Sequence, residues 1–334
     1  MLSDSKIAIL GGGSWATALT KIILNNVSNI NWWVRREETA EHIRNFGHNP
    51  NYISSIEFDK SKLNVSTNLK ETINNSEVLF LVIPSAFLHA EFLNAKITAE
   101  DLKDKIIVSA IKGIIPEFTL IPAAYLNDQF GVEYNNMAIV AGPCHAEEVA
   151  HERLSYLTIA TPTRGRAYAI GELLKCRYIN VNRNDDLVGT EYSAIMKNVY
   201  SIAAGICFGI GYGDNFMAVL ISNAIRETEQ FVDCVYPKHR DVKTSAYLGD
   251  LLVTAYSQYS RNRTFGNMIG KGYSVKFAKL EMKMVAEGYY ASKCVNDIQK
   301  KFELNLPIAD AVYQCLYKGK NPKKTFKSIQ GLLK

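Results

Sequence analysis

Residues 6–24 read KIAILGGGSWATALTKIIL, and this stretch decides the fold of the amino-terminal part. The apolar run predicts a buried strand, the three glycines a tight turn, and the remainder an amphipathic helix. In this context G-x-G-x-x-A is the fingerprint of a dinucleotide-binding turn: Gly11 permits the turn, Gly13 lets a pyrophosphate approach the backbone, and Ala16 packs closely. The helix start adds N–H groups and a positive dipole end. Glycine turns also serve as plain connections, but the position at the start of an α/β chain favours dinucleotide binding.

Short β-rich runs recur between longer amphipathic segments in the first half of the chain. They cover residues 6–10, 30–34, 78–83, 106–111, 137–141, 157–160 and 178–181. Several are apolar at consecutive positions, which is typical of parallel strands covered by helices on both faces. After Asp186 helical periodicity takes over, at residues 187–209, 215–235 and 248–259. The sequence therefore predicts a doubly wound, mostly parallel α/β domain over residues 1–187 and an all-helical domain over residues 188–334.

The composition of the 334 residues excludes several classes of protein. With 47% hydrophobic and 21% charged residues the chain is globular, and its length suits about two domains. The net charge of +5 favours small anionic ligands and is too small to indicate nucleic acid. The six cysteines lack metal-site spacing, and no apolar run reaches the roughly 18 residues that cross a membrane. We expect a cytoplasmic protein with reduced thiols, no metal and no membrane insertion.

The residues after the second predicted strand bear on the choice of cofactor. An NAD site commonly has Asp or Glu there, which binds the ribose 2′-hydroxyl. Here the strand ends in Arg35 and Arg36, and two guanidinium groups suit the 2′-phosphate of NADP. We therefore expect NADPH as the preferred cofactor, with NADH also usable. The alternative is that both arginines are surface residues paired with Glu37, Glu38 or Glu41.

Lys197 interrupts an apolar helical stretch that includes residues 194–196 and 199–206. Hydride transfer between a secondary alcohol and a nicotinamide needs a group that accepts and returns a proton, and burial lowers a lysine pKa toward neutrality. The alternative is a lysine that extends from a helix surface into water. Asp250 and Thr254 share one helix face and could orient such a lysine, although Asp250 also suits a helix cap.

Two further places suit an anionic ligand. Lys112 follows a predicted strand, at the sheet edge where open α/β sheets bind ligands. Ser260, Arg261 and Asn262 combine a hydroxyl, a forked cation and an amide, which is the composition of a phosphate cradle. Both places point to a small phosphorylated substrate.

Motifs in a fixed order run from residue 7 to about residue 318. They are GGGSWATAL at 11–19, KG at 112–113, GPCHAEE at 142–148, IMKNV at 195–199, LGDL at 248–251, SRNR at 260–263 and VAEG at 285–288. This series resembles the bacterial type of NAD(P)-dependent glycerol-3-phosphate dehydrogenase. One departure is Cys144, which stands where that family has Ser or Thr and is a weaker hydrogen-bond donor.

The resemblance implies a Rossmann domain followed by a helical domain of the 6-phosphogluconate dehydrogenase C-terminal type. It implies reversible reduction of dihydroxyacetone phosphate to sn-glycerol 3-phosphate by NADPH or NADH, which supplies glycerophospholipid synthesis, with Lys197 as the catalytic residue. Residues and resemblance together assign the substrate site to Lys112, Gly142, Cys144, Lys197, Asn198, Asp250, Thr254, Ser260, Arg261 and Asn262. They assign the cofactor site to Gly11, Gly13, Ser14, Trp15, Arg35, Arg36, Lys112, Ala146, Arg261, Val285 and Glu287. A homodimer is a further expectation for a helical second domain of this kind.

Two other functions fit parts of the pattern. One is a related two-domain dehydrogenase of another β-hydroxy acid or sugar-acid phosphate, which predicts a carboxylate-binding cluster in place of the phosphate cradle. The other is a non-catalytic NADPH-binding regulator, which predicts cofactor binding without turnover. The presence of both Lys197 and Asp250 argues against the regulator.

Overall fold

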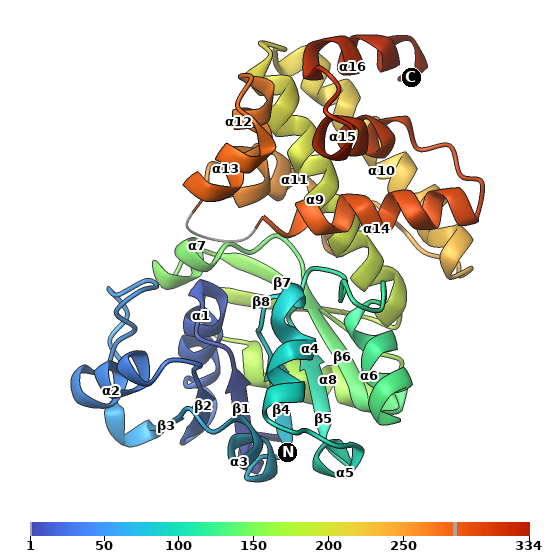
Figure 1. Cartoon of the computed structure of the whole chain (residues 1–334). Coiled ribbons are helices and arrows are strands. Elements are labelled where there is room, and N and C mark those ends of the chain that lie inside the picture. The colour runs from blue at the N-terminus through green and yellow to red at the C-terminus, as the bar shows by residue number, and fades with distance from the viewer. Residues whose placement is uncertain (1, 283–285) are drawn as a thin grey trace. The chain divides into compact units, whose positions relative to one another are not determined.

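The computed structural model describes residues 2–282 and 286–334, which form two compact units (Figure 1). Unit 1 comprises Met1–Ile111 and Leu120–Leu187, and unit 2 comprises Lys112–Thr119 and Val188–Lys334. The predicted domains, residues 1–187 and 188–334, stay a prediction, because a domain is a part of the chain that folds on its own and compactness does not test this. The structure adds that the short segment Lys112–Thr119 packs with the helical unit.

Unit 1 is built on one eight-stranded sheet in the order β3-β2-β1-β4-β5-β6-β7-β8. Its strands are β1 (Ile7–Leu10), β2 (Ile30–Trp33), β3 (Leu63–Ser66), β4 (Val78–Leu81), β5 (Ile106–Ser109), β6 (Met137–Ala141), β7 (Ser155–Ala160) and β8 (Ile179–Asn184). All neighbouring strands are parallel except β6 and β7. The predicted doubly wound, mostly parallel sheet is confirmed. The sequence did not predict β3, because only Val65 of its four residues is buried in this edge strand.

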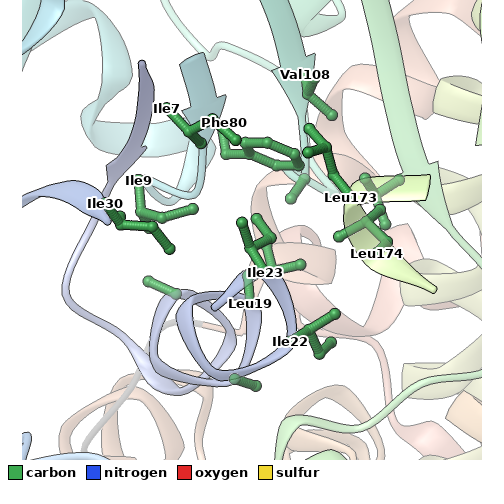
Figure 2. Packing of buried hydrophobic residues seen from close by; sticks show 14 of the residues in the cluster. Ile7, Ile9, Leu19, Ile22, Ile23, Ile30, Phe80, Val108, Leu173 and Leu174 are labelled. Atoms are coloured by element: carbon green, nitrogen blue, oxygen red, sulfur yellow. The ribbon is translucent and has the colours of Figure 1, made fainter. Parts of the chain in front are cut away.

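The helices of unit 1 connect the strands and bury one apolar face. They are α1 (Ser14–Ile23), α2 (Glu37–Phe46), α3 (Leu69–Asn74), α4 (Ser85–Asn94), α5 (Ala99–Leu102), α6 (Pro122–Phe130), α7 (Ala146–Ala150) and α8 (Arg164–Leu174). Figure 2 shows the packing of α1 and α8 against the sheet. Leu19 and Ile23 of α1 face Ile9 of β1 and Phe80 of β4, with Leu173 of α8 beside them. This core fixes the edge of the sheet at which β1 passes into α1.

The regular secondary structure of unit 2 from residue 188 onward is helical in the described residues, as predicted, whereas the segment Lys112–Thr119 forms turns (Figure 1). Its helices are α9 (Leu187–Gly209), α10 (Asp214–Val235), α11 (Asp250–Tyr256), α12 (Arg261–Gly270), α13 (Val275–Glu281), α14 (Glu287–Lys301), α15 (Pro307–Tyr317) and α16 (Pro322–Ile329). The helix expected over residues 248–259 is shorter. A π-helical turn at Ser245–Gly249 precedes α11, and Ser257 then turns extended, with its Oγ accepting from the N–H of Tyr259 at 3.1 Å. A serine that bonds the backbone in this way competes with helix continuation.

Helices α9 and α12 cross closely through glycines. A Cβ at Gly205 of α9 would overlap the carbonyl oxygen of Arg263, and one at Gly266 of α12 would overlap that of Ile202. The crossing therefore requires glycine at both positions. It fixes the start of α12 against the part of α9 that follows Lys197.

Candidate active site

The predicted dinucleotide turn connects β1 to α1 in unit 1. Gly11 has φ +143°, and a Cβ there would lie 2.5 Å from the carbonyl oxygen of Val82, so only glycine allows this approach of two backbones. Gly13 is the N-cap residue of α1, and among the described residues no side chain caps this helix start. A Cβ on Gly13 would meet no heavy atom within 4 Å. A pyrophosphate therefore fits in front of Ser14 and Trp15, the first residues of α1.

The two arginines lie where β2 ends, and both are exposed. Nη1 of Arg35 lies 3.4 Å from Oε1 of Glu91 on α4, and the guanidinium group lies over the ring of Phe87 at 5.9 Å. Arg36 is the N-cap residue of α2. Glu37, one of the alternative partners, pairs instead with a later arginine of α2. Both guanidinium groups are thus accessible to a ligand at the end of β2.

The loop after β6 also belongs to unit 1 and holds three predicted site residues. Gly142 has φ +108°, and a Cβ there would lie 2.8 Å from the carbonyl oxygen of Tyr156, so the position requires glycine. The Cys144 side chain is buried, and Ala146 is the first residue of α7. The loop therefore has the same plan as the first turn, a strand followed by a glycine at positive φ and a helix start.

Lys197 lies inside α9 among apolar neighbours and is only 4% exposed, so it is not a surface lysine. Its Nζ forms an ion pair and a hydrogen bond with Oδ1 of Asp250, the first residue of α11, which is 1% exposed. Nζ of Lys112 lies 3.8 Å from the other carboxylate oxygen. Unit 2 thus brings together a buried amine, a buried carboxylate and a second amine that is partly exposed.

The surroundings of Lys197 change its acidity. Burial lowers its pKa to about 7, because the ammonium group loses its hydration. The carboxylate of Asp250 raises the pKa by stabilising the charged form, and the positive charge of Lys112 lowers it. An amine with a pKa near neutrality both donates and accepts a proton at working pH.

Asn198 and Thr254 support this group through the backbone. Nδ2 of Asn198 donates to the carbonyl oxygen of Lys112 at 2.7 Å, which attaches the segment Lys112–Thr119 to α9. Oγ1 of Thr254 donates to the carbonyl oxygen of Asp250 at 2.6 Å. Asp250 and Thr254 share a face of α11 as expected, but the hydroxyl proton of Thr254 is directed at the helix backbone.

The predicted phosphate cradle forms the start of α12, and two of its side chains have partners within unit 2. Oγ of Ser260, the N-cap residue, accepts from the N–H of Arg263 at 3.3 Å. Oδ1 of Asn262 accepts from the N–H of Gly288 at the start of α14, at 3.0 Å. Arg261 is the first residue of the helix. The cradle is therefore preorganised by its own hydrogen bonds.

Ser201, which the sequence analysis did not single out, links the cradle to α9, the helix that carries Lys197. It lies one turn after Lys197 and is fully buried. Its Oγ donates to the carbonyl oxygen of Thr254 at 2.7 Å and lies 2.8 Å from Oγ of Ser260. Because the carbonyl oxygen can only accept, Ser260 supplies the proton shared by the two hydroxyls. The signal in the sequence was a polar residue four positions after Lys197 in an apolar helix.

Glu287 is the first residue of α14, and Val285 lies outside the described residues. Within residues 2–282 and 286–334, no three His, Cys, Asp or Glu side chains are placed to hold a metal ion. In the same ranges, none of the helices has the length and apolar character that crossing a membrane requires.

Comparisons with known proteins point to one family. Family models described as the N-terminus and the C-terminus of NAD-dependent glycerol-3-phosphate dehydrogenase match residues 6–167 and 186–327. Relatives named as NAD(P)+ glycerol-3-phosphate dehydrogenases come from Salinibacter ruber, 33% identical over 96% of this chain and 92% of the relative, and Chlorobium limicola, 33% identical over 94% of each. The crystal structure of glycerol-3-phosphate dehydrogenase from Coxiella burnetii has a TM-score of 0.89 at 26% identity, covering 97% of this chain and 98% of that one.

Proposed function

The chain belongs to the NAD-dependent glycerol-3-phosphate dehydrogenase family, and from this premise we propose that it catalyses the reversible reduction of dihydroxyacetone phosphate to sn-glycerol 3-phosphate by NAD(P)H. This reaction supplies the backbone of glycerophospholipids. The observation that carries the proposal is the buried ion pair of Lys197 and Asp250 beside Lys112. A buried amine with a pKa of about 7 is the proton donor and acceptor that the interconversion of a ketone and a secondary alcohol requires.

The proposed proton transfer is made by Lys197. In reduction its ammonium form donates a proton to the carbonyl oxygen of the substrate, and in oxidation its neutral amine accepts the hydroxyl proton. Asp250 holds Nζ in place through Oδ1. The nicotinamide, when bound, supplies or accepts the hydride.

We assign the phosphate group of the substrate to Arg261 and to Nδ2 of Asn262. A phosphate is an acceptor, so it needs donors, and the hydroxyl proton of Ser260 is already shared with Ser201. Lys112 adds a positive charge next to Asp250. The other proposed substrate residues are kept on the resemblance: Gly142, Cys144, Asn198, Asp250, Thr254 and Ser260.

We propose that the cofactor binds at the turn between β1 and α1, with Gly11, Gly13, Ser14 and Trp15, and that Arg35 and Arg36 favour NADPH over NADH. Support comes from the open space at Gly13 and from the two exposed guanidinium groups at the end of β2. Lys112, Ala146, Arg261, Val285 and Glu287 complete the proposed cofactor set on the resemblance.

A cytoplasmic location is proposed on the cysteine pattern of the sequence, and a homodimer on the resemblance of the helical domain. Light scattering on the purified protein tests the dimer. The expected mass is about twice the 37.4 kDa of one chain, and a mass of one chain at micromolar concentration contradicts it.

The decisive experiment follows NADPH absorbance when the purified protein meets dihydroxyacetone phosphate, with NADH in a parallel series. We expect both cofactors to be oxidised, NADPH faster. Lys197→Ala should lower kcat by at least about 100-fold, the usual effect of removing a general acid, while the Kd for NADPH stays within about twofold. Lys197→Met, which keeps the buried apolar volume, should behave in the same way.

The matched control is Lys276→Ala, which removes an exposed lysine of α13 and should leave kcat unchanged. Near-normal turnover in Lys197→Ala would contradict the role of Lys197. Measurable NADPH binding without oxidation by dihydroxyacetone phosphate would contradict the substrate. It would then direct the search to other β-hydroxy acids, sugar-acid phosphates or a regulatory role.

A further inference from the structure

Asn49 is a polar side chain that the site described above does not include, and it is completely buried in unit 1. It follows α2, which ends at Phe46, and precedes β3 in the chain. A buried carboxamide is costly unless its donors and acceptor are all hydrogen-bonded. The partners of Asn49 therefore show what the residue does.

Every hydrogen-bonding direction of the Asn49 side chain is used. Nδ2 donates to the carbonyl oxygen of Gly12 at 3.0 Å and to Oγ1 of Thr17 at 2.9 Å. Oδ1 accepts from the N–H groups of Asn51 at 3.0 Å and Tyr52 at 3.2 Å. These partners fix the orientation of the amide, because a flipped side chain would place its Oδ1 against the carbonyl oxygen of Gly12 and its Nδ2 against the N–H groups of Asn51 and Tyr52. The side chain thus connects the loop after α2 to the turn between β1 and α1.

This connection sets the direction of two peptide groups in the turn. The carbonyl oxygen of Gly12 is held by Asn49, and that of Gly13 accepts from Oγ1 of Thr17 at 3.1 Å. In a planar trans peptide the N–H points away from the carbonyl. Holding both carbonyls on the Asn49 side therefore turns the N–H groups of Gly13 and Ser14 to the opposite side. Those are groups that a pyrophosphate uses at a helix start.

We propose that Asn49 is a positioning residue for the cofactor: it holds the glycine turn in the conformation that receives the pyrophosphate before the dinucleotide arrives. The inference rests on the proposed use of NAD(P)H and extends it to a residue outside the fingerprint. The pyrophosphate is common to both cofactors, so Asn49 acts equally on NADPH and NADH. Discrimination between them remains with Arg35 and Arg36.

Asn49→Ala tests this through cofactor affinity measured by fluorescence titration. We expect the Kd to rise about tenfold for NADPH and for NADH, with the ratio of the two unchanged, as for the loss of one or two hydrogen bonds that preorganise a site. In the protein without cofactor, hydrogen exchange at residues 12–17 should become faster. Thr17→Val, which removes one partner and keeps the volume, should raise both Kd values about threefold and replaces Asn49→Ala if that variant does not fold.

The matched control is Asn26→Ala in the same unit. Nδ2 of Asn26 also donates to two backbone carbonyls, those of Leu173 at 3.0 Å and Lys175 at 2.9 Å, at the other end of α1. It should lower the melting temperature and leave both Kd values within about twofold of wild type, because it lies away from the turn.

Kd values within about twofold of wild type in Asn49→Ala would overturn the inference, as would an equal loss of affinity in Asn26→Ala. A rise in Kd for NADPH alone would also overturn it and assign the loop after α2 to the 2′-phosphate. Failure of the wild type to bind either cofactor would contradict the proposed function. In that case, the exchange rates at residues 12–17 still decide whether Asn49 holds the turn.

Discussion

Replacing Asp250 by asparagine should lower the pKa of Lys197 further. Burial lowers the pKa of Lys197 and the carboxylate, which contacts Nζ, partly offsets this, so that the pKa is about 7 with Asp250 in place. An opposite charge at such range shifts a pKa by about 1 to 3 units, so Lys197 should have a pKa of about 6 or below in Asp250→Asn. The repulsion from Lys112, 3.8 Å from the same carboxylate, acts in the same direction.

The consequence is a pH-dependent loss of the reductive reaction. Reduction needs the protonated amine, so kcat falls as the pH rises through the pKa of Lys197. With a shift of about one unit, the ratio of variant to wild-type kcat should fall from about 0.8 at about pH 5.5 to about 0.1 at about pH 8.5. In the oxidative direction the neutral amine is needed, so the acidic limb should move to lower pH.

The assay is kcat from NADPH absorbance at saturating dihydroxyacetone phosphate across this range. The measured quantity is the pH at which the rate halves, since the absolute rate also reports changes in the placement of Lys197. Asp233→Asn is the control, because Asp233 is an exposed carboxylate of α10 that pairs with Arg240, and the midpoint should not move. An alkaline midpoint that stays in place or rises in Asp250→Asn would refute the reasoning.

Three further changes test other parts of the molecule. Gly205→Ala should lower the free energy of unfolding by about 2 kcal/mol in chemical denaturation, because the added methyl group overlaps the backbone of α12. The control is Gly165→Ala, where the added Cβ would meet no heavy atom within 4 Å, and the free energy should change by less than about 1 kcal/mol. Glu227 accepts N–H groups at the start of α15, and burial raises its pKa to about 7. Between pH 4.5, which is the ordinary pKa of this carboxyl, and about pH 7, the folded protein holds one proton more than the unfolded chain. Stability therefore falls as the pH rises through this window. The melting temperature of Glu227→Gln should lack that fall. Arg35→Ala should reduce kcat/KM about tenfold for NADPH and within twofold for NADH; equal losses would contradict its role.

Those parts of the fold that leave a hydrophobic pattern or a glycine turn in the sequence could be predicted. Residues 6–10 are apolar at consecutive positions and meet a glycine turn, and they form β1 as expected. The strand β3 was not predicted, because this edge strand of four residues buries only one side chain and so carries almost no hydrophobic signal. The early end of α11 depends on a single serine that bonds its own turn, which a count of helical periodicity cannot detect.

The residues of the candidate site likewise fall into those with a local signal in the sequence and those that depend on tertiary contacts. An amine inside an apolar helix marks Lys197 from the sequence alone, and the spacing of Asp250 and Thr254 gives their common face. The approach of Lys112 to Asp250 depends on tertiary packing, and no local pattern contains it. Asn49 and Ser201 escaped for a different reason. A buried polar residue is recognised by its partners, and decisive partners of these two lie in other elements: the turn before α1 for Nδ2 of Asn49, and α11 for Ser201.

The segment Lys112–Thr119 also bears on how the chain folds while it is being synthesised. Its first carbonyl group receives the amide of Asn198, which lies 86 residues further along. At about 5 to 20 residues per second, a ribosome adds that partner roughly 4 to 17 seconds later. During this interval β1 to β5 are complete, while the segment that follows β5 has no helix to join. Until α9 is synthesised, the nascent protein therefore carries this segment without its partner, as a place where a chaperone or a protease can bind.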